Sequence, residues 1–367
     1  MNAQVRPIRR GTSPFRRLLR PLIKPDVFDF WASCVNPHWT WERPLAKLVA
    51  REPASRDAVT LLFKPNAHWA GFQPGQHVNL GVDVDGARLT RSYSLTEPTR
   101  TDGLLAITVK AIEGGRVSEH LCRGAKLGDI FELGAAFGEM TLPSRPQGAW
   151  LFLAAGSGIT PLMALIRQLA GQGMPVDLTL VYWARQRDEF CFLDELRALA
   201  AAQPRFRLRL MLTREPALRA DEGEGRIDAE LISTLDLRVA HQQVLACGPG
   251  GFVDTARALL GEHAKSFQAE AFTPPPITID DTGDVEVHLR RSGRRLRLPR
   301  GQSLLTALEA EGLKPASGCR MGICNTCACG KFSGSARQLH TGELMHEATP
   351  ALKLCIHSAA TDLELDL

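Results

Sequence analysis

The sequence predicts a multi-domain chain with an antiparallel β-barrel, a doubly wound α/β domain and a small α+β module, in that order. Three observations support this prediction. Short strand-like segments fill residues 45–145, and strands alternate with helical segments over 146–272. Within 285–367, four cysteines crowd into the stretch from Cys319 to Cys329. A chain of 367 residues is long enough for two or three domains.

Residues 1–44 form a basic, aromatic-rich extension. The formal charge is +4, but residues 1–24 hold seven basic and no acidic residues, which leaves −3 for the remainder. Such an arm is either a solvated tail or a segment attracted to anionic lipid. A transit peptide is disfavoured by three prolines in the arm. The segment "FDFWASCVNPHWTW" that follows is expected to dock on the protein body through Phe28, Trp31 and Trp39.

The barrel is predicted from five segments that alternate or run apolar between turn residues: "KLVAREP", "AVTLLFKP", "HVNLGVDVDG", "RLTRSYSLT" and "LLAITVKAI". The α/β domain is predicted from five further strands with helical segments between them: "WLFLAAG", "VDLTLVYW", "FRLRLMLT", "QVLACG" and "FQAEAF". The uncharged run 146–166 is long enough to raise the question of a membrane span, but "AAGSGITP" breaks it. We therefore expect a buried strand and a helix start there.

Residues 273–284, "TPPPITIDDTGD", have the Pro-rich, acidic composition of an exposed linker. The segment after them predicts a β-hairpin and then a helix that leads into the cysteine loop. Cysteines that are mostly clustered, without a secretory signal, indicate a reducing, cytoplasmic compartment.

The cysteine spacing is the strongest motif. Cys319, Cys324 and Cys327 read C-x4-C-x2-C and are followed by Cys355, which is the spacing of a plant-type [2Fe–2S] site. The alternative is a four-thiolate zinc site, which usually pairs two C-x2-C motifs. Cys329 is expected to be a small buried residue, because a ligand there would leave Cys355 unexplained.

Two motifs in the barrel could hold a flavin. "RSYS" at 91–94 offers a cation, a ring and a hydroxyl at a strand end, although Tyr93 could equally be a half-buried strand aromatic. "GGRVS" at 114–118 has glycines that admit close backbone approach, and amides at a helix start that can cradle a phosphate.

Two glycine turns in the α/β domain suit a dinucleotide. "AAGSGITP" follows the first strand and opens a helix, and "ACGPGGF" at 246–252 follows a later strand at the same sheet edge. Ligands bind at this edge in open α/β folds. Cys247 could also be only a buried strand-end thiol.

Together these motifs resemble the ferredoxin–NADP reductase superfamily with a plant-type ferredoxin domain fused at the C-terminus. The resemblance covers about 45–367, with the motifs in the family's order. It implies a β-grasp fold for the last domain. It also implies FAD, NAD(P)H and a [2Fe–2S] cluster as cofactors, with FAD favoured over FMN by the 114–118 stretch. One departure is Gly128-Asp129, where many relatives continue with a Pro-Gly turn.

The resemblance also implies residue roles. In the flavin site, Arg91 would bind phosphate, Tyr93 would pack on the isoalloxazine beside Ser92, and Ser94 would hydrogen-bond near N5. The other implied flavin residues are Gly115, Val117, Ser118 and Phe272, with Glu270 beside the ring. The implied nucleotide residues are Gly156, Gly158, Thr160, Pro161, Cys247, Gly248 and Pro249. Ser94, Cys247 and Glu270 would be catalytic, and Cys319, Cys324, Cys327 and Cys355 would ligate iron.

Arg185 and Arg187 follow the second strand of the α/β domain, where an adenosine ribose would lie. Guanidinium groups there suit a 2′-phosphate, so NADPH is expected over NADH. Either arginine could instead be a solvated strand cap.

The resemblance implies electron transfer from NAD(P)H through the flavin to the cluster and on to a separate protein. The expected acceptor is a membrane fatty-acyl desaturase, because bacterial reductases of that kind look most similar, and the alternatives are a ring-hydroxylating or other oxygenase and a hybrid-cluster protein. "RRSGRRLRLPR" at 290–300 places six Arg on the cluster module, which together with the arm could face an anionic bilayer or an acidic partner. A non-catalytic redox-sensing module is the alternative of another class. No motif indicates nucleic-acid binding.

Overall fold

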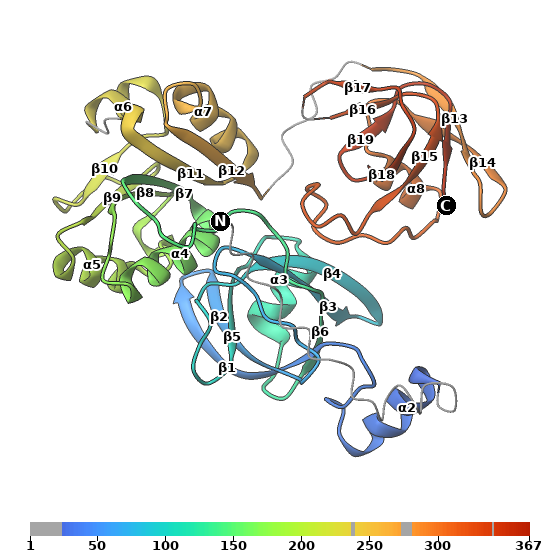
Figure 1. The fold of residues 1–367 in the computed structure, drawn as a ribbon, viewed down its shortest axis with the longest axis horizontal. Helices are drawn as coiled ribbons and strands as arrows, with labels where there is room; N and C mark the ends of the chain where they lie inside the picture. Colours follow the sequence, from blue (N-terminus) through green and yellow to red (C-terminus); the bar gives the residue numbers. More distant parts are fainter. Residues whose placement is uncertain (1–23, 236–238, 273–280, 340) are drawn as a thin grey trace. The chain divides into compact units, whose positions relative to one another are not determined.

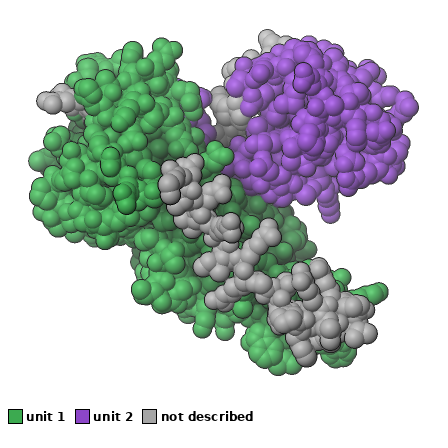
Figure 2. All heavy atoms as spheres, viewed as in Figure 1, with its two compact units in different colours: residues 1–248, 255–270 green, residues 249–254, 271–367 purple. Residues whose placement is uncertain are grey.

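The computed structural model describes residues 24–235, 239–272, 281–339 and 341–367. The chain divides into two compact units (Figure 2). The first comprises Met1–Gly248 and Thr255–Glu270, and the second comprises Pro249–Asp254 and Ala271–Leu367. The expected arm over residues 1–23 and most of the expected linker, 273–280, lie outside the described residues.

The first unit begins with the predicted antiparallel barrel (Figure 1). Its strands lie in the order β4-β3-β6-β1-β2-β5, and neighbours in this order are antiparallel. The strands are β1 (Leu45–Ser55), β2 (Ala58–Pro65), β3 (His77–Val84), β4 (Ala87–Ser94), β5 (Leu105–Lys110) and β6 (Ile130–Leu133). All five predicted segments are therefore strands of one sheet, and β6 was not predicted.

The chain beyond β4 brings the two edges of this sheet together. Leu95 bridges to Ile107 of β5, and the Thr96 amide donates a hydrogen bond of 2.9 Å to the Ala106 carbonyl. Side chains such as Phe63 fill the interior, since alternate residues of each strand point inward. The short helix α3 (Arg116–Glu119) and a π-helical turn, His120–Gly124, follow β5 and add buried apolar side chains to this core.

The second lobe of the first unit is the predicted α/β fold. Its sheet order is β10-β9-β8-β7-β11-β12, and the pairs β10–β9, β9–β8, β8–β7 and β7–β11 are parallel. The strands are β7 (Ala149–Ala155), β8 (Asp177–Ala184), β9 (Phe206–Leu212), β10 (Glu222–Glu224), β11 (Gln242–Gly248) and β12 (Ser266–Ala271). The helices are α4 (Ile159–Gly171), α5 (Leu193–Ala202), α6 (Ala229–Thr234) and α7 (Gly250–Leu260).

The strand order reverses at β7, which lies between β8 and β11. Ligands in open α/β sheets bind at such a switch point, beyond the carboxyl ends of the strands. The uncharged run 146–166 contains β7, a 3₁₀ turn at Gly156–Gly158 and the start of α4, as expected. Across the described ranges, no helix is long and apolar enough to cross a bilayer.

The second unit contains the α+β module. Its five-stranded sheet has the order β14-β13-β20-β15-β18, and a three-stranded sheet has the order β17-β16-β19. Ser303 caps α8 (Leu304–Ala310) by accepting a hydrogen bond from the Thr306 amide. The strands are β13 (Asp284–Leu289), β14 (Arg294–Pro299), β15 (Ala328–Ser333), β16 (Ala336–Gln338), β17 (Leu344–Met345), β18 (Thr349–Lys353), β19 (His357–Ala359) and β20 (Leu363–Leu365).

The described part of the extension contains helix α2 (Pro25–Val35), which precedes β1. Phe28 packs edge-on against Trp41 with ring centroids 5.2 Å apart, as expected for a docked aromatic. The prediction was wrong for Trp31 and Trp39, which are 66% and 57% exposed. The helix is instead held in place by a polar residue, Asp29. Its buried carboxylate accepts hydrogen bonds from the segment that leads into β1.

Candidate functional site

A buried set of polar side chains joins the start of β3, the end of β4 and the end of β12. His77 Nδ1 lies 3.0 Å from the Ser94 hydroxyl oxygen, and His77 Nε2 lies 2.6 Å from a carboxylate oxygen of Glu270. All three residues are buried, so each relies on these neighbours for hydrogen bonding. The structure thus brings together Ser94 and Glu270, both predicted from the sequence, through an imidazole that was not predicted.

Cys247 is the next-to-last residue of β11 and interacts with Glu270. Its side chain is fully buried, with Sγ 3.3 Å from the sulfur of Met140. Burial, and secondarily the charge of the Glu270 carboxylate, raises the pKa of the Cys247 thiol well above its usual value. A buried thiol that stays neutral packs like a small apolar side chain and does not act as a nucleophile.

The remaining residues of "RSYS" lie along β4. Ser92 lies opposite Asn79 in the pairing of β4 with β3, and its hydroxyl donates a hydrogen bond to the Asn79 side-chain oxygen. Arg91 is partly exposed, and Tyr93 packs against the barrel core. Burial raises the pKa of the Tyr93 phenol. Tyr93 is thus a half-buried strand aromatic, and its stacking on a flavin stays a prediction.

The "GGRVS" turn opens a short helical segment, as predicted: Gly115 is the N-cap of α3, which has four residues and continues directly into the π-helical turn His120–Gly124. The Ser118 hydroxyl accepts a hydrogen bond from the Ile112 amide at 3.2 Å and donates to the Gly115 carbonyl at 3.0 Å. A Cβ at Gly115 would lie 2.5 Å from that hydroxyl oxygen, so the loop requires glycine. Val117 is buried in the barrel core, whereas a side chain at Gly114 would meet open space.

The two glycine turns of the α/β lobe touch each other. A Cβ at Gly158 would lie 2.0 Å from the carbonyl oxygen of Cys247 and 2.7 Å from the amide nitrogen of Gly248. Only glycine therefore allows the turn after β7 to pack against the end of β11. Gly156 has a left-handed φ of 54°, and a Cβ there would meet open space. This opening leaves the backbone accessible to a ligand at the switch point.

The remaining predicted nucleotide residues continue from these turns. Thr160 and Pro161 are buried in the first turn of α4, where the Thr160 hydroxyl donates a hydrogen bond of 2.9 Å to the Ser157 carbonyl. Pro249 directly follows β11 and opens the first segment of the second unit. Phe272 follows β12 and is partly buried, also within the second unit.

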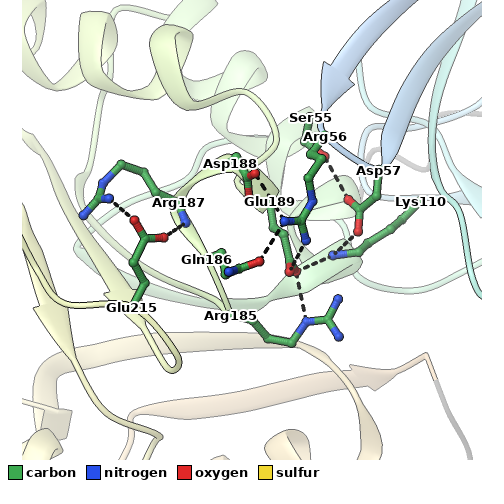
Figure 3. Close-up of polar contacts among 10 residues, drawn as sticks. All are labelled: Ser55, Arg56, Asp57, Lys110, Arg185, Gln186, Arg187, Asp188, Glu189 and Glu215. Carbon is green, nitrogen blue, oxygen red and sulfur yellow. Dashed lines mark hydrogen bonds and ion pairs between the residues drawn. The ribbon is translucent and has the colours of Figure 1, made fainter.

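Glu189 is the centre of a charge cluster between the barrel and the α/β lobe of the first unit (Figure 3). The Glu189 side chain is only 3% exposed. Its carboxylate pairs with Arg56 at 3.0 Å and with Lys110 at 2.8 Å, both from the barrel, and with Arg185 at 3.1 Å, from its own lobe. Burial acts to raise the pKa of Glu189, but the hydrogen bonds from Lys110 and Arg185 lower it overall. Arg185 uses its Nε atom for this contact and is half exposed, so the outer edge of its guanidinium faces solvent.

Arg187 is held differently from Arg185 (Figure 3). Its side chain donates to both carboxylate oxygens of Glu222 at 2.9 and 2.7 Å. It also pairs with Glu215, as Figure 3 shows. Arg197 pairs with the same Glu222, at 2.9 Å. A 2′-phosphate would have to displace two carboxylates from Arg187. The expectation that Arg187 binds this phosphate therefore finds no support in the geometry, and we assign it a structural role.

Acid should weaken this part of the lobe through Glu222. Hydrogen bonds from Arg187 lower the pKa of the Glu222 carboxyl from 4.5 to about 2, so the carboxylate stabilises the fold above about pH 4.5. This contribution should be lost as the pH falls toward 2. We expect Glu222→Gln to unfold more easily than wild type near neutral pH, with the difference shrinking in acid, in thermal unfolding at several pH values. Glu230→Gln, on exposed α6, should match wild type, and an unchanged acid dependence in Glu222→Gln would exclude this role.

The loop after α8 positions three of the four predicted cluster ligands. Backbone amides of Met321 and Cys324 donate to the Cys319 sulfur at 3.3 Å, and the Cys319 amide donates to the Cys324 sulfur at 3.2 Å. Left-handed φ values at Arg320, Gly322 and Asn325 curl the chain around these sulfurs. Amides directed at cysteine sulfurs are the environment that stabilises an iron–sulfur cluster, so the loop fits this cofactor.

The four thiols interact as two pairs. A hydrogen bond from Cys319 lowers the pKa of Cys324 to about 4, and one from Cys355 lowers the pKa of Cys327 to about 7. Within each pair, the hydrogen bond favours the thiolate form of the accepting cysteine, and the thiolate is the form that binds iron. Among the described residues, no three His, Cys, Asp or Glu side chains converge as in an ion site. Three of the thiols thus lie in the loop after α8, and Cys355, which follows β18, interacts with one of them, Cys327, but the four sulfurs do not form a single group.

The fifth cysteine of this region, Cys329, lies on β15 opposite Leu352 of β18. It is buried in the apolar core of the module, and this burial raises the pKa of its thiol to about 12. Cys329 therefore has the environment of the small buried residue that the spacing predicted.

The basic hairpin of β13 and β14 carries less free charge than its sequence suggests. Five of its arginines pair with acidic residues of the same unit, at 2.5 to 3.8 Å, and Arg290 also stacks over Phe332 at 4.3 Å. The pairs are Arg290–Glu364, Arg291–Asp366, Arg295–Glu286, Arg297–Asp284 and Arg300–Asp281. Exposed pairs contribute little stability, but they neutralise charge. The hairpin alone therefore gives no strong reason to expect a bilayer or an acidic partner.

The residues that the sequence did not single out are His77, Met140 and Arg214. His77 could have been found from strand pairing, since antiparallel pairing of "HVNLGVDV" with "ARLTRSYS" places it opposite Ser94. Met140 has no such signal, because it lies in an irregular loop. Arg214 follows β9, and its amide donates a hydrogen bond of 3.0 Å to the Arg185 carbonyl at the end of β8. The sheet edge thus gathers two arginines, of which only Arg185 was predicted.

Three family models match successive parts of the chain. An oxidoreductase FAD-binding domain matches residues 45–142, an oxidoreductase NAD-binding domain matches 152–258, and a 2Fe-2S iron–sulfur cluster binding domain matches 287–357. These matches confirm FAD, NAD(P)H and a [2Fe–2S] cluster as the cofactors, and they agree with the three folds seen in the structure.

Two relatives and one solved structure are similar over most of the chain. A protein named NADPH oxidoreductase from Mycobacterium tuberculosis is 32% identical and covers 97% of this chain and 93% of its own length. A component of the 1,2-phenylacetyl-CoA epoxidase of Escherichia coli is 32% identical and covers 77% of this chain and 85% of its own length. Phthalate dioxygenase reductase, a modular structure for electron transfer from pyridine nucleotides to [2Fe–2S], is 25% identical with a TM-score of 0.59 and covers 88% of this chain and 97% of its own.

Proposed function

Because the chain belongs to the ferredoxin–NADP reductase superfamily, as a flavoprotein with a fused C-terminal plant-type [2Fe–2S] domain, we propose that it is the reductase component of an oxygenase system. It would pass electrons from NAD(P)H through FAD and the cluster to a separate oxygenase protein. One observation carries this proposal. Proteins named as an epoxidase component and as phthalate dioxygenase reductase are similar to this chain over 85% and 97% of their own lengths.

When bound, FAD takes two electrons from NAD(P)H as hydride and returns them one at a time to the cluster. The chain's part is to bind and orient these groups. Arg91 and the open backbone at Gly114 suit the flavin phosphates, and the open backbone at Gly156 suits the nucleotide pyrophosphate. Cys319, Cys324, Cys327 and Cys355 would hold the cluster. The buried Cys247 thiol would line the nicotinamide site without reacting.

We infer that His77 moves a proton between Ser94 and Glu270. As the serine oxygen takes up a proton from a group bound beside it, its own hydroxyl proton passes to His77 Nδ1 and the imidazole gives its Nε2 proton to the carboxylate, so no serine alkoxide is formed. The reverse transfer restores the set. The contacts of 3.0 and 2.6 Å are short enough for such transfers. All three residues are buried, so bulk water does not compete with this route. Ser94, the predicted partner of the flavin N5, would thereby exchange protons with the protein interior.

The preferred nucleotide under this proposal is NADPH. Arg185 and Arg214 lie side by side at the carboxyl ends of β8 and β9, and both are exposed or half exposed. Arg214 also lines a pocket at this edge with Thr213 and Glu215. Two guanidinium groups can bind a 2′-phosphate through charge-assisted hydrogen bonds, which the diol of NADH does not offer. The name of the M. tuberculosis relative is in line with this choice.

Removing the second arginine should test the nucleotide preference. We expect Arg214→Ala to raise the KM for NADPH by roughly tenfold, as expected for one charge-assisted hydrogen bond, with little change for NADH. Steady-state ferricyanide reduction with each nucleotide measures both values. Arg207→Ala removes an exposed arginine from the same strand, β9, and should leave both unchanged. Equal effects on NADPH and NADH would rule out recognition of the 2′-phosphate by Arg214.

The fatty-acyl desaturase that the sequence led us to expect is the less well supported candidate for the acceptor protein. Its support was the extension and the basic hairpin, and most arginines of that hairpin are paired within their own unit. The relatives named for an acceptor system point to oxygenases instead. A reductase for a hybrid-cluster protein and a non-catalytic redox module have no named relative among those compared above.

Reconstitution with separate acceptors tests the proposal. The purified holoprotein and NADPH would be combined with a purified oxygenase component, or with membranes that contain a fatty-acyl desaturase, and hydroxylated or desaturated product measured. Cytochrome c reduction in the same samples reports whether the reductase itself is active. We expect product with an oxygenase component. Active reductase that supports only the desaturase would overturn the assignment, and the absence of cytochrome c reduction would favour the non-catalytic module.

A further inference from the structure

A lysine joins the loop that carries three of the predicted cluster ligands to the segment that carries the fourth. Lys353, the last residue of β18, donates a hydrogen bond of 2.6 Å from its Nζ to the Gly322 carbonyl. Gly322 lies in the loop between two of the ligands, and Lys353 lies two residues before Cys355. The contact therefore links the loop directly to the chain that presents the fourth thiol.

Gly322 is held against this segment by two further contacts. A Cβ at Gly322 would lie 2.6 Å from Ile356 Cδ1, and its φ is left-handed at 76°, so only glycine fits both the turn and the packing. The Gly322 backbone also forms a hydrogen bond with the Cys355 side chain. Of these contacts, the one from Lys353 alone brings a positive charge.

The position of Lys353 is fixed by the sheet. Lys353 lies opposite Ala328 of β15, the residue that directly follows Cys327. The next amide, that of Leu354, donates a hydrogen bond of 3.3 Å to the Cys327 carbonyl. The Lys353 side chain is half-buried, so its ammonium group is partly shielded from solvent. Backbone pairing thus directs this ammonium to the loop, unlike that of a freely moving surface lysine.

Lys353 differs from Arg320, a second cation of this region, in the group that it contacts. Arg320 donates to both carboxylate oxygens of Glu309, at 2.9 and 2.5 Å, and this ion pair neutralises its charge. No acidic side chain in the described part of the chain pairs with Lys353, whose Nζ donates to a neutral carbonyl. Nearby charge is one of the quantities that set the reduction potential of an iron–sulfur cluster. An unneutralised ammonium favours the reduced form, because reduction adds negative charge.

We propose that Lys353 is a positioning residue of the cluster site and that its charge raises the reduction potential of the cluster. Its hydrogen bond to Gly322 holds the loop and the Cys355 segment together. Its ammonium makes the cluster a better acceptor for the electrons of the flavin. This role requires the [2Fe–2S] cofactor but no particular acceptor protein, so it goes beyond the proposed function and can fail without affecting it.

Redox titration of the purified holoprotein, followed by the EPR signal of the reduced cluster, tests the effect of the charge. Lys353→Met removes the hydrogen bond and the charge, Lys353→Gln can keep a donor but carries no charge, and Lys353→Arg can keep both. We expect Met and Gln to lower the ratio of reduced to oxidised cluster at a fixed potential by roughly tenfold, or about 59 mV for one electron. Lys353→Arg should match wild type. Lys314→Met is the matched control, because Lys314 is an exposed lysine of the same module.

The positioning role is measured by the rate at which the visible absorbance of the cluster disappears in excess EDTA. Lys353→Met should lose its cluster roughly tenfold faster than wild type, as expected for the loss of one hydrogen bond from a charged donor. Lys353→Arg and Lys314→Met should lose it at the wild-type rate. Reduction of bound FAD by NADPH should be unchanged in every variant, which shows that the first unit is intact.

The two measurements decide between the outcomes. A lower potential and faster loss of the cluster in Lys353→Met, with both restored in Lys353→Arg, support the proposal. A wild-type potential in Lys353→Gln would overturn the charge effect, and this variant decides the question even if Lys353→Met fails to hold a cluster. Wild-type retention of the cluster in Lys353→Met would overturn the positioning role. Equal shifts of the potential in Lys314→Met and Lys353→Met would also contradict the proposal, because any lysine of the module would then suffice.

Discussion

Replacing Cys324 with serine should remove the [2Fe–2S] cluster and abolish electron transfer to one-electron protein acceptors. The Cys324 sulfur accepts a hydrogen bond of 3.2 Å from the Cys319 amide, and a further hydrogen bond from the Cys319 side chain lowers the pKa of the Cys324 thiol. Serine keeps the size of the side chain but binds iron poorly, since iron–sulfur clusters are held by thiolates. The loss should appear as missing reddish-brown absorbance and as iron content well below two per chain.

The flavin half of the protein should be unaffected by this change. Reduction of ferricyanide, a small acceptor that can take electrons from the flavin, should continue at close to the wild-type rate. Cys329→Ala is the matched control, because Cys329 lies two residues from Cys327 but is buried in the core of the module. It should keep both iron and protein-acceptor activity. If Cys329→Ala lost the cluster while Cys324→Ser kept it, the ligand assignment would be wrong.

Replacing His77 with glutamine should slow turnover by roughly ten- to hundredfold, the lower part of the range for a lost acid–base group. Glutamine can keep hydrogen bonds to Ser94 and Glu270, but it cannot accept a proton at one end while releasing one at the other. The flavin should remain bound, because the imidazole contacts these two side chains rather than a predicted phosphate ligand. Stopped-flow reduction and reoxidation of the flavin, followed across pH and in D₂O, measures this effect.

A structural role for His77 would give a different result from a proton-transfer role. Loss of proton transfer should change the shape of the pH profile and increase the solvent isotope effect, whereas looser packing should lower the rate equally at every pH. Imidazole added to His77→Ala should restore part of the rate if proton transfer is the function. His263→Gln, at an exposed position after α7, should behave as wild type. A wild-type isotope effect in His77→Gln would exclude the relay.

Much of the fold follows from patterns that are local in sequence. The barrel strands alternate between turn residues, and the α/β strands are continuous apolar runs followed by glycine turns, so their type and order could be predicted before their contacts were known. The cysteine loop was equally direct, because a cluster imposes a spacing on its ligands. The sequence predicted that the two glycine turns lie at the same sheet edge, but it did not predict the direct contact of Gly158 with Cys247.

The rest depends on which side chains meet across the fold. The amphipathic pattern of α2 does not say which of its aromatic residues face inward, and the buried Asp29, rather than Trp31, decided the helix orientation. Arg185 and Arg187 look equivalent in the sequence. Only Arg187, however, forms ion pairs with Glu215 and Glu222, which lie about 30 residues further along the chain. The contact of His77 with Glu270 could not be predicted locally, because Glu270 lies on β12, the last strand of the α/β lobe along the chain.

The position of Glu189 has a thermodynamic consequence for the first unit. Arg185 has two roles. It pairs with the Glu189 carboxylate, as Arg56 and Lys110 do, and it lies at the sheet edge where NADPH would bind. A ligand phosphate that draws on Arg185 leaves Glu189 more dependent on the two cations of the barrel. Binding of the dinucleotide and the ion pairing between the two lobes are then thermodynamically coupled. By reciprocity, the free energy by which the dinucleotide changes this ion pairing equals the free energy by which the ion pairing changes the binding of the dinucleotide.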